Sequence, residues 1–414
     1  MWYNQDMKIA LLGYGKEGQA TEKYFSGKGA ECEIFENLTP EEFSEKDYSS
    51  YDIIFRSPSV PPLRGQPKQT SLTRYFFEHC PCPIIGVTAT KGKGTTCSFI
   101  KALLDAAGEK AYLVGNIGTP AIEVLDELTE ESVVVYELSS FQLWDLEKSP
   151  HISVVGTIEP DHLNVHDGFS DYLSAKMNIA RHQSAEDFLI YYKNNPDSVR
   201  IAEESLARKI AYPLQIPQEI IEAVKLPGKH NVENATAAIC AAACYKNISP
   251  DEYCRQFTEE IKRGLSSFKG LPHRLEFVRE VGGVRYYDDN FSTNPASTRV
   301  AIQAFPDDDL VLIVGGRDKT ENEDLPEIFE VITAENVKKI LLIGESGREL
   351  KRRFSDERFE IASSLQEAVE KAAKTAATLE KPVVLMSPAA ASFDMFENVY
   401  DRGEKYQELV WALK

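Results

Sequence analysis

The residues with the clearest chemical meaning lie between Gly86 and Thr96, where the sequence reads Gly-Val-Thr-Ala-Thr-Lys-Gly-Lys-Gly-Thr-Thr. Backbone N–H groups of such a glycine loop surround phosphate oxygens, a lysine reaches the terminal phosphates, and a hydroxyl binds Mg²⁺. Val87 stands in place of the usual first glycine and Gly94 in place of the usual hydroxyl, so the hydroxyl role moves to Thr95. A strand is expected before this loop and a helix after it, and this context favours ATP binding over a purely structural turn. The expected ATP contacts are Lys91, Gly92, Lys93, Gly94, Thr95 and Thr96.

A second glycine motif, Gly13-Tyr-Gly15-Lys-Glu-Gly18, follows the expected strand Lys8–Leu12 and opens a helix, with Glu36 near the end of the next strand. Such a turn brings backbone N–H groups to a phosphate at a helix N-terminus. Taken alone, it would indicate the dinucleotide site of an oxidoreductase. The motif is short, and a tight strand–helix turn without a ligand explains it equally well.

The elements that position these loops alternate along almost the whole chain. Short β-branched runs separated by helical patterns predict an α/β fold with parallel sheets covered by helices. The expected strands are Lys8–Leu12, Glu31–Phe35, Asp52–Phe55, Ile84–Thr88, Lys110–Val114, Ser132–Glu137, His151–Gly156, Asp187–Tyr191, Leu310–Val314, Lys338–Ile343 and Pro382–Met386. Expected helices include Gly94–Ala107, Ser170–Arg181, Asn231–Lys246 and Ser364–Leu379. Two alternating runs within Leu275–Asp288 flank Gly282-Gly283 and predict a β-hairpin.

Two proline-containing segments indicate domain boundaries. Cys80-Pro-Cys-Pro83 precedes a new strand, and Phe268-Lys-Gly-Leu-Pro272 precedes the hairpin. Proline removes a backbone donor and biases the preceding residue towards extended geometry, so both segments interrupt helices. We therefore expect three domains, at about 1–82, 83–270 and 271–414.

The composition excludes several classes of protein. A formal net charge of −19 argues against binding to nucleic acid or to an anionic membrane, since both need a basic surface. The seven cysteines are odd in number and lack zinc-ligand spacing, which indicates reduced thiols. The first eight residues are largely polar and lead into a strand, so we expect no signal peptide there, and no apolar run reaches the ~18 residues of a membrane span. We expect a cytoplasmic protein.

A series of further segments follows the order found in Mur ligases. They are Gly115-Asn-Ile-Gly-Thr-Pro120, Tyr136-Glu-Leu-Ser-Ser-Phe-Gln142, Glu159-Pro-Asp-His-Leu163, Ser174-Ala-Lys-Met-Asn-Ile179, Leu226-Pro-Gly-Lys-His-Asn-Val-Glu-Asn234, Leu271-Pro-His-Arg274 and Ser387-Pro-Ala-Ala-Ala-Ser-Phe-Asp394. The glycine loop also resembles that of folylpolyglutamate synthases. Over essentially its whole length the chain resembles the Mur ligase family, and it is most similar to the glutamate-adding branch.

The resemblance implies a Rossmann-like N-terminal domain for the uridine end of the substrate, a central P-loop ATPase-type parallel sheet, and a C-terminal Rossmann-like domain for the amino acid. It implies that Lys93, Glu137, His162 and Lys176 are catalytic. One Mg²⁺ would be held by Thr95 and Glu137, and a second by His162 and a carbamylated Lys176. Carbamylation needs a neutral amine and hence a desolvated lysine.

Other contacts follow from the resemblance in the same way. Besides the glycine loop, ATP would be held by Asn231, Asn234, Arg274 and Asp289. The other substrates would be held by Gly15, Lys16, Asn116, Ser139, Gln142, His162, Thr293, Lys319, Ser392 and Phe393. Judged without the resemblance, His162 would be a surface residue, Lys176 part of a solvated helix face and Lys319 a surface lysine. His166 lies in the same segment as His162, and a loop role explains it equally well.

The chain departs from the family pattern at two positions. Ala89 replaces a glycine of the usual loop, and Phe291 stands where well-known glutamate-adding members carry a lysine. The second change alters the expected contact with the incoming amino acid. Its carboxylates would then be held by Lys319 and Ser392, or by another cation such as Arg317.

The implied activity is ATP-dependent addition of D-glutamate to UDP-N-acetylmuramoyl-L-alanine through an acyl phosphate, in peptidoglycan precursor synthesis. The alternatives are a related ligase that adds L-glutamate or another amino acid, a folylpolyglutamate-synthase-like ligase, and the nucleotide-binding oxidoreductase. An oxidoreductase leaves the loop at Gly92-Lys93 without a role. We expect a monomer that acts on small molecules.

Overall fold

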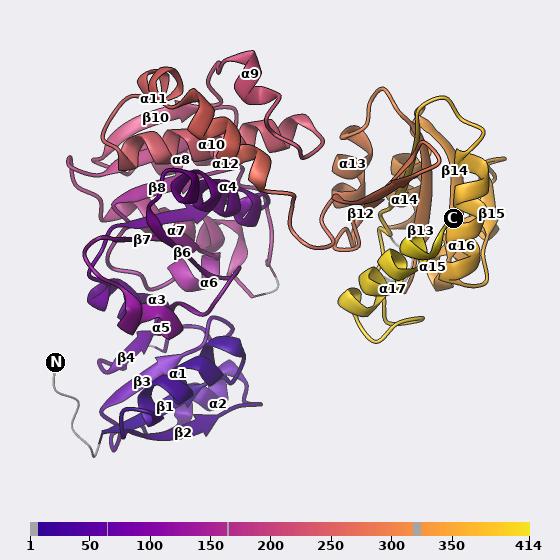
Figure 1. Cartoon of the computed structure of the whole chain (residues 1–414). Coiled ribbons are helices and arrows are strands. Elements are labelled where there is room, and N and C mark those ends of the chain that lie inside the picture. Colours follow the sequence, from indigo (N-terminus) through magenta and orange to yellow (C-terminus); the bar gives the residue numbers. More distant parts are fainter. Residues whose placement is uncertain (1–6, 64, 164, 318–323) are drawn as a thin grey trace. The chain divides into compact units, whose positions relative to one another are not determined.

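The computed structural model describes residues 7–63, 65–163, 165–317 and 324–414. The expected α/β class with parallel sheets is confirmed, and the described strands form three sheets of four, six and six strands. The chain divides into two compact units (Figure 1). The first contains Met1–Val224 and Val232–Phe268, and the second contains Lys225–Asn231 and Lys269–Lys414.

The first sheet is parallel and has the strand order β2-β1-β3-β4. Its strands are β1 (Lys8–Leu12), β2 (Glu31–Phe35), β3 (Ile53–Arg56) and β4 (Gln69–Ser71). The associated helices are α1 (Lys16–Ser26), α2 (Pro40–Glu45) and α3 (Leu72–His79). Both faces of β1 are buried from Ile9 onwards, as expected for a central parallel strand with a continuous apolar sequence.

The second sheet, also parallel, has the order β10-β9-β8-β5-β7-β6. Its strands are β5 (Ile84–Thr88), β6 (Lys110–Gly115), β7 (Ser132–Glu137), β8 (Ile152–Val155), β9 (Phe188–Tyr192) and β10 (Arg208–Tyr212). The helices are α4 (Lys93–Ala106), α5 (Ala121–Val124), η1 (Leu125–Glu127), α6 (Ser140–Leu143), α7 (Gly168–Arg181), α8 (Pro196–Glu203), α9 (Gln218–Ile221), α10 (Lys229–Tyr245), α11 (Pro250–Gln256) and α12 (Thr258–Ser267). Strands β5 and β7 are buried along their whole length and pair in parallel. Their carboxyl ends therefore lie side by side at the same edge of the sheet.

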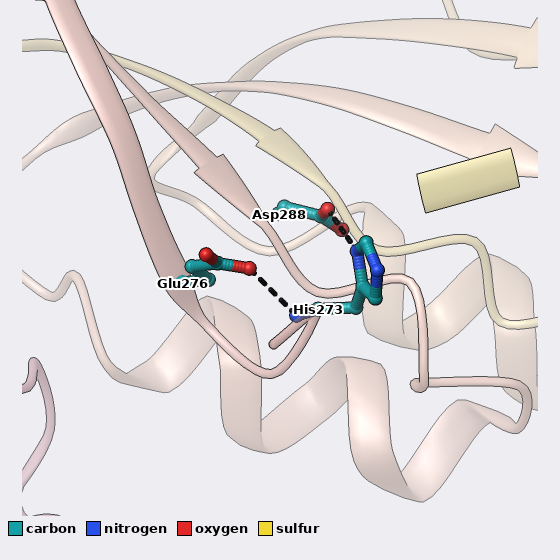
Figure 2. A group of neighbouring side chains, drawn as sticks. All are labelled: His273, Glu276 and Asp288. Carbon is teal, nitrogen blue, oxygen red and sulfur yellow. Dashed lines mark hydrogen bonds and ion pairs between the residues drawn. The ribbon is translucent and has the colours of Figure 1, made fainter. Parts of the chain in front are cut away.

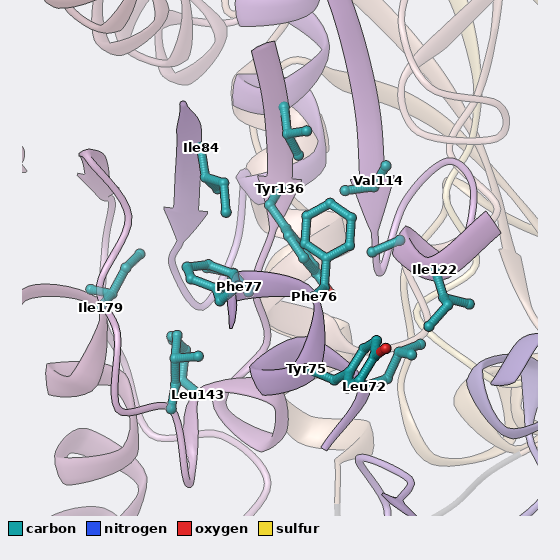
Figure 3. Close-up of a cluster of buried hydrophobic side chains, with 14 of the residues drawn as sticks. Leu72, Tyr75, Phe76, Phe77, Ile84, Val114, Ile122, Tyr136, Leu143 and Ile179 are labelled. Atoms are coloured by element: carbon teal, nitrogen blue, oxygen red, sulfur yellow. The ribbon is translucent and has the colours of Figure 1, made fainter. Parts of the chain in front are cut away.

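Helix α3 joins the first two sheets through one apolar core (Figure 3). The rings of Phe76 and Phe77 lie 5.6 and 5.7 Å from the ring of Tyr136 on β7. Tyr75, on the same helix, lies 5.3 Å from Phe25 on α1. Because α3 contacts both sheets with buried aromatic side chains, their apolar residues form a continuous cluster.

The third sheet has the order β11-β12-β16-β13-β14-β15, and only β11 and β12 pair antiparallel within the described residues. The expected hairpin at Gly282-Gly283 is present. The strands are β11 (Glu276–Val281), β12 (Val284–Asp288), β13 (Asp309–Gly315), β14 (Val337–Ile343), β15 (Phe359–Ile361) and β16 (Pro382–Met386). The helices are α13 (Pro295–Gln303), α14 (Leu325–Ile332), α15 (Gly344–Arg353), α16 (Leu365–Ala376) and α17 (Val399–Ala412). Among all helices that the structure describes, none is long and apolar enough to cross a membrane.

Candidate active site

The glycine loop connects β5 to α4 and requires glycine at position 92. Gly92 has a φ of +83°, which is in the left-handed region, and a Cβ there would lie 2.9 Å from Asn234 Oδ1. The Thr96 hydroxyl lies 3.3 Å from that same Oδ1, so α10 packs directly against the loop. No side chain caps the start of α4. Its first N–H groups therefore lack helical partners and form the type of site that binds phosphate.

Two lysine side chains converge on this loop. Lys93 Nζ donates to the carbonyl oxygens of Ala89 and Thr90, at 3.0 and 3.1 Å. Lys176 Nζ, from α7, donates to the same Ala89 oxygen and to Thr88 Oγ1, both at 3.1 Å. The predicted phosphate-binding lysine and the predicted carbamylated lysine thus share one acceptor at the end of β5.

The environment of Lys176 favours a neutral amine. The side chain is 1% exposed. Burial lowers its pKa well below the usual range, and the charge of Lys93 lowers it further, while Asp161 and Glu137 act in the opposite direction. A neutral primary amine is the form that reacts with CO₂, so this position fits a carbamate, whose oxygens would be metal ligands.

Glu137 ends β7 at the same sheet edge. It is paired in register with Val87 of β5 and with Gly115 of β6, and it is 7% exposed. Burial raises the pKa of the Cys97 thiol on α4, the Glu137 charge raises it further, and the Lys93 charge lowers it. Both charges therefore act on the first turns of α4, which begins at Lys93 and also carries Thr95. A carboxylate and a hydroxyl are the hard oxygen ligands that Mg²⁺ prefers, so these residues fit the ion.

The structure distinguishes the two histidines of the segment after β8. His166 is buried; its Nδ1 lies 2.8 Å from Asp171 Oδ2 and its Nε2 lies 2.9 Å from Ser140 Oγ, so both ring nitrogens are occupied. The side chain of His162 is 52% exposed, and its Nε2 lies 3.6 Å from Asp161 Oδ2. His162 is therefore the histidine that is accessible to a ligand.

Ser139 and Gln142 form a capping box at the start of α6. The Gln142 carboxamide oxygen accepts from Ser139, and its Nε2 donates to Glu17 Oε1 at 2.6 Å. Burial raises the pKa of Glu17 to about 7. Glu17 follows Gly15 and Lys16, which are exposed at the start of α1, so Gln142 connects the second sheet to the first glycine turn.

A buried ion pair also connects these two sheets. Arg56, at the end of β3, donates from Nη2 and Nε to the two carboxylate oxygens of Asp145, at 2.5 and 2.9 Å. It is 1% exposed and also donates to the Val60 and Phe141 carbonyls. Such a two-pronged pair fixes geometry as well as charge. Asn116 lies at the same edge, where its backbone N–H donates to the Glu137 carbonyl at 3.3 Å.

In the second unit, Asp289 lies between two elements. Its carboxylate accepts from Ser387 Oγ at 2.8 Å and from the Leu275 N–H at 3.2 Å, and burial raises its pKa to about 7. Ser392 is buried, whereas Phe393 is 63% exposed. Thr293 is half-buried. Lys319 lies outside the described residues.

Arg402 is a residue that the sequence analysis missed. It is fully buried on α17 and donates to the Asn290 and Ala390 carbonyls at 3.1 and 3.2 Å and to Asn290 Oδ1 at 2.5 Å. It therefore holds together the loop that contains Thr293 and the loop that contains Ser392. The available signal was its position on the buried face of α17 with Gly403, Tyr406 and Val410.

His273, Glu276 and Asp288 form a group with metal-ligand chemistry (Figure 2). His273 Nδ1 lies 2.7 Å from Asp288 Oδ2, and Glu276 Oε2 accepts from the His273 N–H at 2.8 Å. The Gln407 amide donates to both carboxylates, at 2.8 and 2.9 Å. The amide donor thus occupies the position a cation would take, and we interpret the group as a structural network beside Arg274.

Comparison with known proteins identifies the family of the chain. Residues 87–242 match the Mur ligase middle domain, and residues 273–390 match the Mur ligase, glutamate ligase domain. UDP-N-acetylmuramoylalanine–D-glutamate ligases are similar over nearly the whole chain. That of Clostridium kluyveri is 32% identical and covers 97% of this chain and 96% of its own. The ligase of Acetivibrio thermocellus is 33% identical, and the match covers 99% of this chain and 97% of that protein.

Solved structures share the fold at low sequence identity. A UDP-N-acetylmuramate–alanine ligase from Thermotoga maritima has a TM-score of 0.59 at 15% identity and covers 99% of this chain and 100% of its own. A MurF ligase from Thermotoga maritima, in complex with ADP, has a TM-score of 0.59 at 14% identity and covers 98% and 97%. These relatives belong to one family and are more than 30% identical over nearly their full length. The first glycine turn is therefore part of a Mur ligase and not of an oxidoreductase. The chain belongs to the Mur ligase family, whose members are ATP-dependent amide ligases of peptidoglycan synthesis that use ATP and Mg²⁺.

Proposed function

We propose that this chain adds D-glutamate to UDP-N-acetylmuramoyl-L-alanine. The observation that carries the proposal is the similarity, over 97% of the chain, to relatives with that activity in their names. The γ-phosphoryl group of ATP passes to the alanyl carboxylate and gives an acyl phosphate and ADP. The glutamate amine then attacks the acyl carbon, loses a proton, and displaces phosphate.

The three segments expected from the sequence have separate tasks in this proposal. Residues 1–82 bind the uridine nucleotide through Gly15 and Lys16, residues 83–270 bind ATP, and residues 271–414 bring the amino acid. The capping box of Ser139 and Gln142 supports the first assignment, because its contact with Glu17 places the two regions beside each other.

The residues around α4 carry out phosphoryl transfer by positioning and charge neutralisation. Lys93 leaves the Ala89 and Thr90 carbonyls and contacts the β- and γ-phosphate oxygens. Thr95 and Glu137 hold one Mg²⁺, and His162 with a carbamylated Lys176 holds a second. Bound Mg²⁺ neutralises charge on the transferring group. Asn231, Asn234, Arg274 and Asp289 bind the rest of ATP.

We propose a cytoplasmic monomer that acts on small molecules alone. The net charge of −19 supports the absence of nucleic-acid and anionic-membrane partners. The carboxylates of the amino acid are held by Ser392 and by a cation in the segment that includes Arg317 and Lys319.

The acceptor decides between this function and its alternatives. With UDP-N-acetylmuramoyl-L-alanine and ATP, we expect phosphate release and adduct formation with D-glutamate, and less with L-glutamate. The panel also contains L-lysine, meso-diaminopimelate and glycine. A preference for a diamino acid would overturn the glutamate assignment, whereas a preference for L-glutamate would correct only the stereochemistry. Activity with folates in place of the nucleotide substrate would indicate the folylpolyglutamate-type alternative.

A further inference from the structure

Phe291 occupies the position where a lysine was expected, and its ring lies against a second cation. The Arg274 guanidinium carbon is 4.9 Å from the centre of the Phe291 ring. This distance is within the range of cation–π contacts, and guanidinium groups also stack on aromatic faces. Arg274 is exposed, and among the described residues the Phe291 ring is the partner that the structure gives its guanidinium.

Phe291 is held in place by a second ring contact and by a backbone hydrogen bond. The edge of Tyr400, in the first turn of α17, packs on it with ring centres 5.2 Å apart and planes at 81°. The Phe291 N–H donates to the His273 carbonyl at 3.2 Å, so the backbone of Phe291 is tied to the residue before Arg274. The ring is thus a fixed surface, whereas the long Arg274 side chain has many rotamers when nothing orders it.

A lysine at position 291 would push the Arg274 side chain away and would not hold it in place. Its ammonium would repel the Arg274 guanidinium at this distance. The change from lysine to phenylalanine therefore does more than remove a contact with the amino acid, because it supplies a surface on which Arg274 can stack.

We propose that Phe291 is a positioning residue that orients Arg274 towards the phosphates of ATP. The ring itself acts on the binding of the nucleotide, whereas the missing lysine ammonium concerns the incoming amino acid. The proposal rests on the proposed function only in that Arg274 is an ATP contact. It explains why a cation can be absent at position 291 without loss of the ligase reaction.

The test separates the two substrates by their kinetics. Phe291→Leu keeps an apolar side chain of similar volume but removes the ring face, and Phe291→Tyr keeps the face. For Phe291→Leu we expect the KM for ATP to rise by about 3- to 30-fold, the range that corresponds to one cation–π contact. The KM for the amino acid should change by less than about twofold. Phe291→Tyr should behave as the unmodified protein.

A matched control is available in the same unit. Phe277 is 48% exposed, and its ring packs on Tyr287. Phe277→Leu removes a ring of the same kind and should leave both KM values unchanged. If Phe291→Leu raises the KM for the amino acid and not that for ATP, or changes neither, the proposal is wrong.

Binding of ATP alone keeps this test independent of the acceptor. The Kd for ATP, measured by calorimetry, should rise in Phe291→Leu and in Arg274→Ala, and the double variant should resemble Arg274→Ala, because the ring acts through the guanidinium. Additive losses in the double variant would overturn the proposal. If the ATP affinities of the variants follow this pattern but the protein has no ligase activity on UDP-N-acetylmuramoyl-L-alanine, the proposed function is wrong and this inference stands.

Discussion

Replacement of Lys93 by alanine should lower kcat by about 10³-fold or more, the effect expected when one charge is removed from a preorganised site. The ammonium lies at the start of α4 and donates to the loop carbonyls of Ala89 and Thr90, from which it can turn to the phosphates. The loss should fall on phosphoryl transfer, because the Lys93 ammonium is proposed to neutralise charge on the transferring group. ATP-dependent phosphate release under saturating substrates measures it.

Lys101→Ala is a matched control for that variant. Lys101 lies on the same helix and forms an exposed i,i+4 pair with Asp105, so its removal changes the charge of α4 equally. Pairs of this kind contribute about 0.3–0.5 kcal/mol, and we expect nearly normal kcat. A normal kcat for the Lys93→Ala variant would contradict the assignment of this loop as the phosphate-binding loop.

Replacement of Lys176 by alanine should lower kcat by at least about 100-fold. The proposed carbamate is a direct Mg²⁺ ligand, and the loss of an outer-shell partner alone already costs up to about 100-fold. The variant would lack the proposed carbamate oxygens and leave a cavity beside Thr88 and Ala89. Short-chain carboxylic acids can enter this cavity and supply two oxygens, so acetate or propionate should restore part of the activity. Initial rates across a series of carboxylic acids measure the effect.

Lys176→Met provides the control for rescue. Methionine fills the space of the lysine stem without a nitrogen, so the variant should be inactive and should not respond to carboxylic acids. In the unmodified protein, ¹³C NMR with labelled bicarbonate should show a carbamate signal that both variants lack. Full activity of Lys176→Ala, or a crystal structure with Lys176 unmodified and Mg²⁺ ligated by other groups, would contradict the carbamate.

The sequence predicted the central strands, and the three strands that it missed all lie at the edges of their sheets. Ile84–Thr88, Ser132–Glu137 and Pro382–Met386 were expected with the bounds that the structure shows. They are buried on both faces and consist mainly of apolar residues, many of them β-branched, so their own sequences specify them. The strands β4, β10 and β15 were not expected. Two have only three residues, and β10 begins with exposed Arg208 and Lys209, so these strands depend on pairing with a neighbour.

The site shows the same division between local and long-range information. A single loop contains Gly92, Lys93 and Thr95, and their types and spacing predicted its chemistry. Lys93 and Lys176 both donate to the carbonyl oxygen of Ala89. Lys176 lies 87 positions after Ala89 along the chain. No local pattern specifies such a contact. The clamp formed by Arg402 is likewise visible only once α17 is packed against the two loops.

The continuous core around α3 has a consequence for cooperativity. Loss of the first sheet would expose Phe76 and Phe77 and their contacts on β7, so the two sheets of the first unit should unfold together. The second unit has its own clusters on the two faces of its sheet. Heating the full chain in a calorimeter should therefore give two transitions. ATP, whose proposed phosphate contacts are at the start of α4, should raise the midpoint of the transition that belongs to the first unit. The boundary between cooperative units would then lie at the segment after α12, while the first two sheets, distinct in topology, would behave as one thermodynamic body.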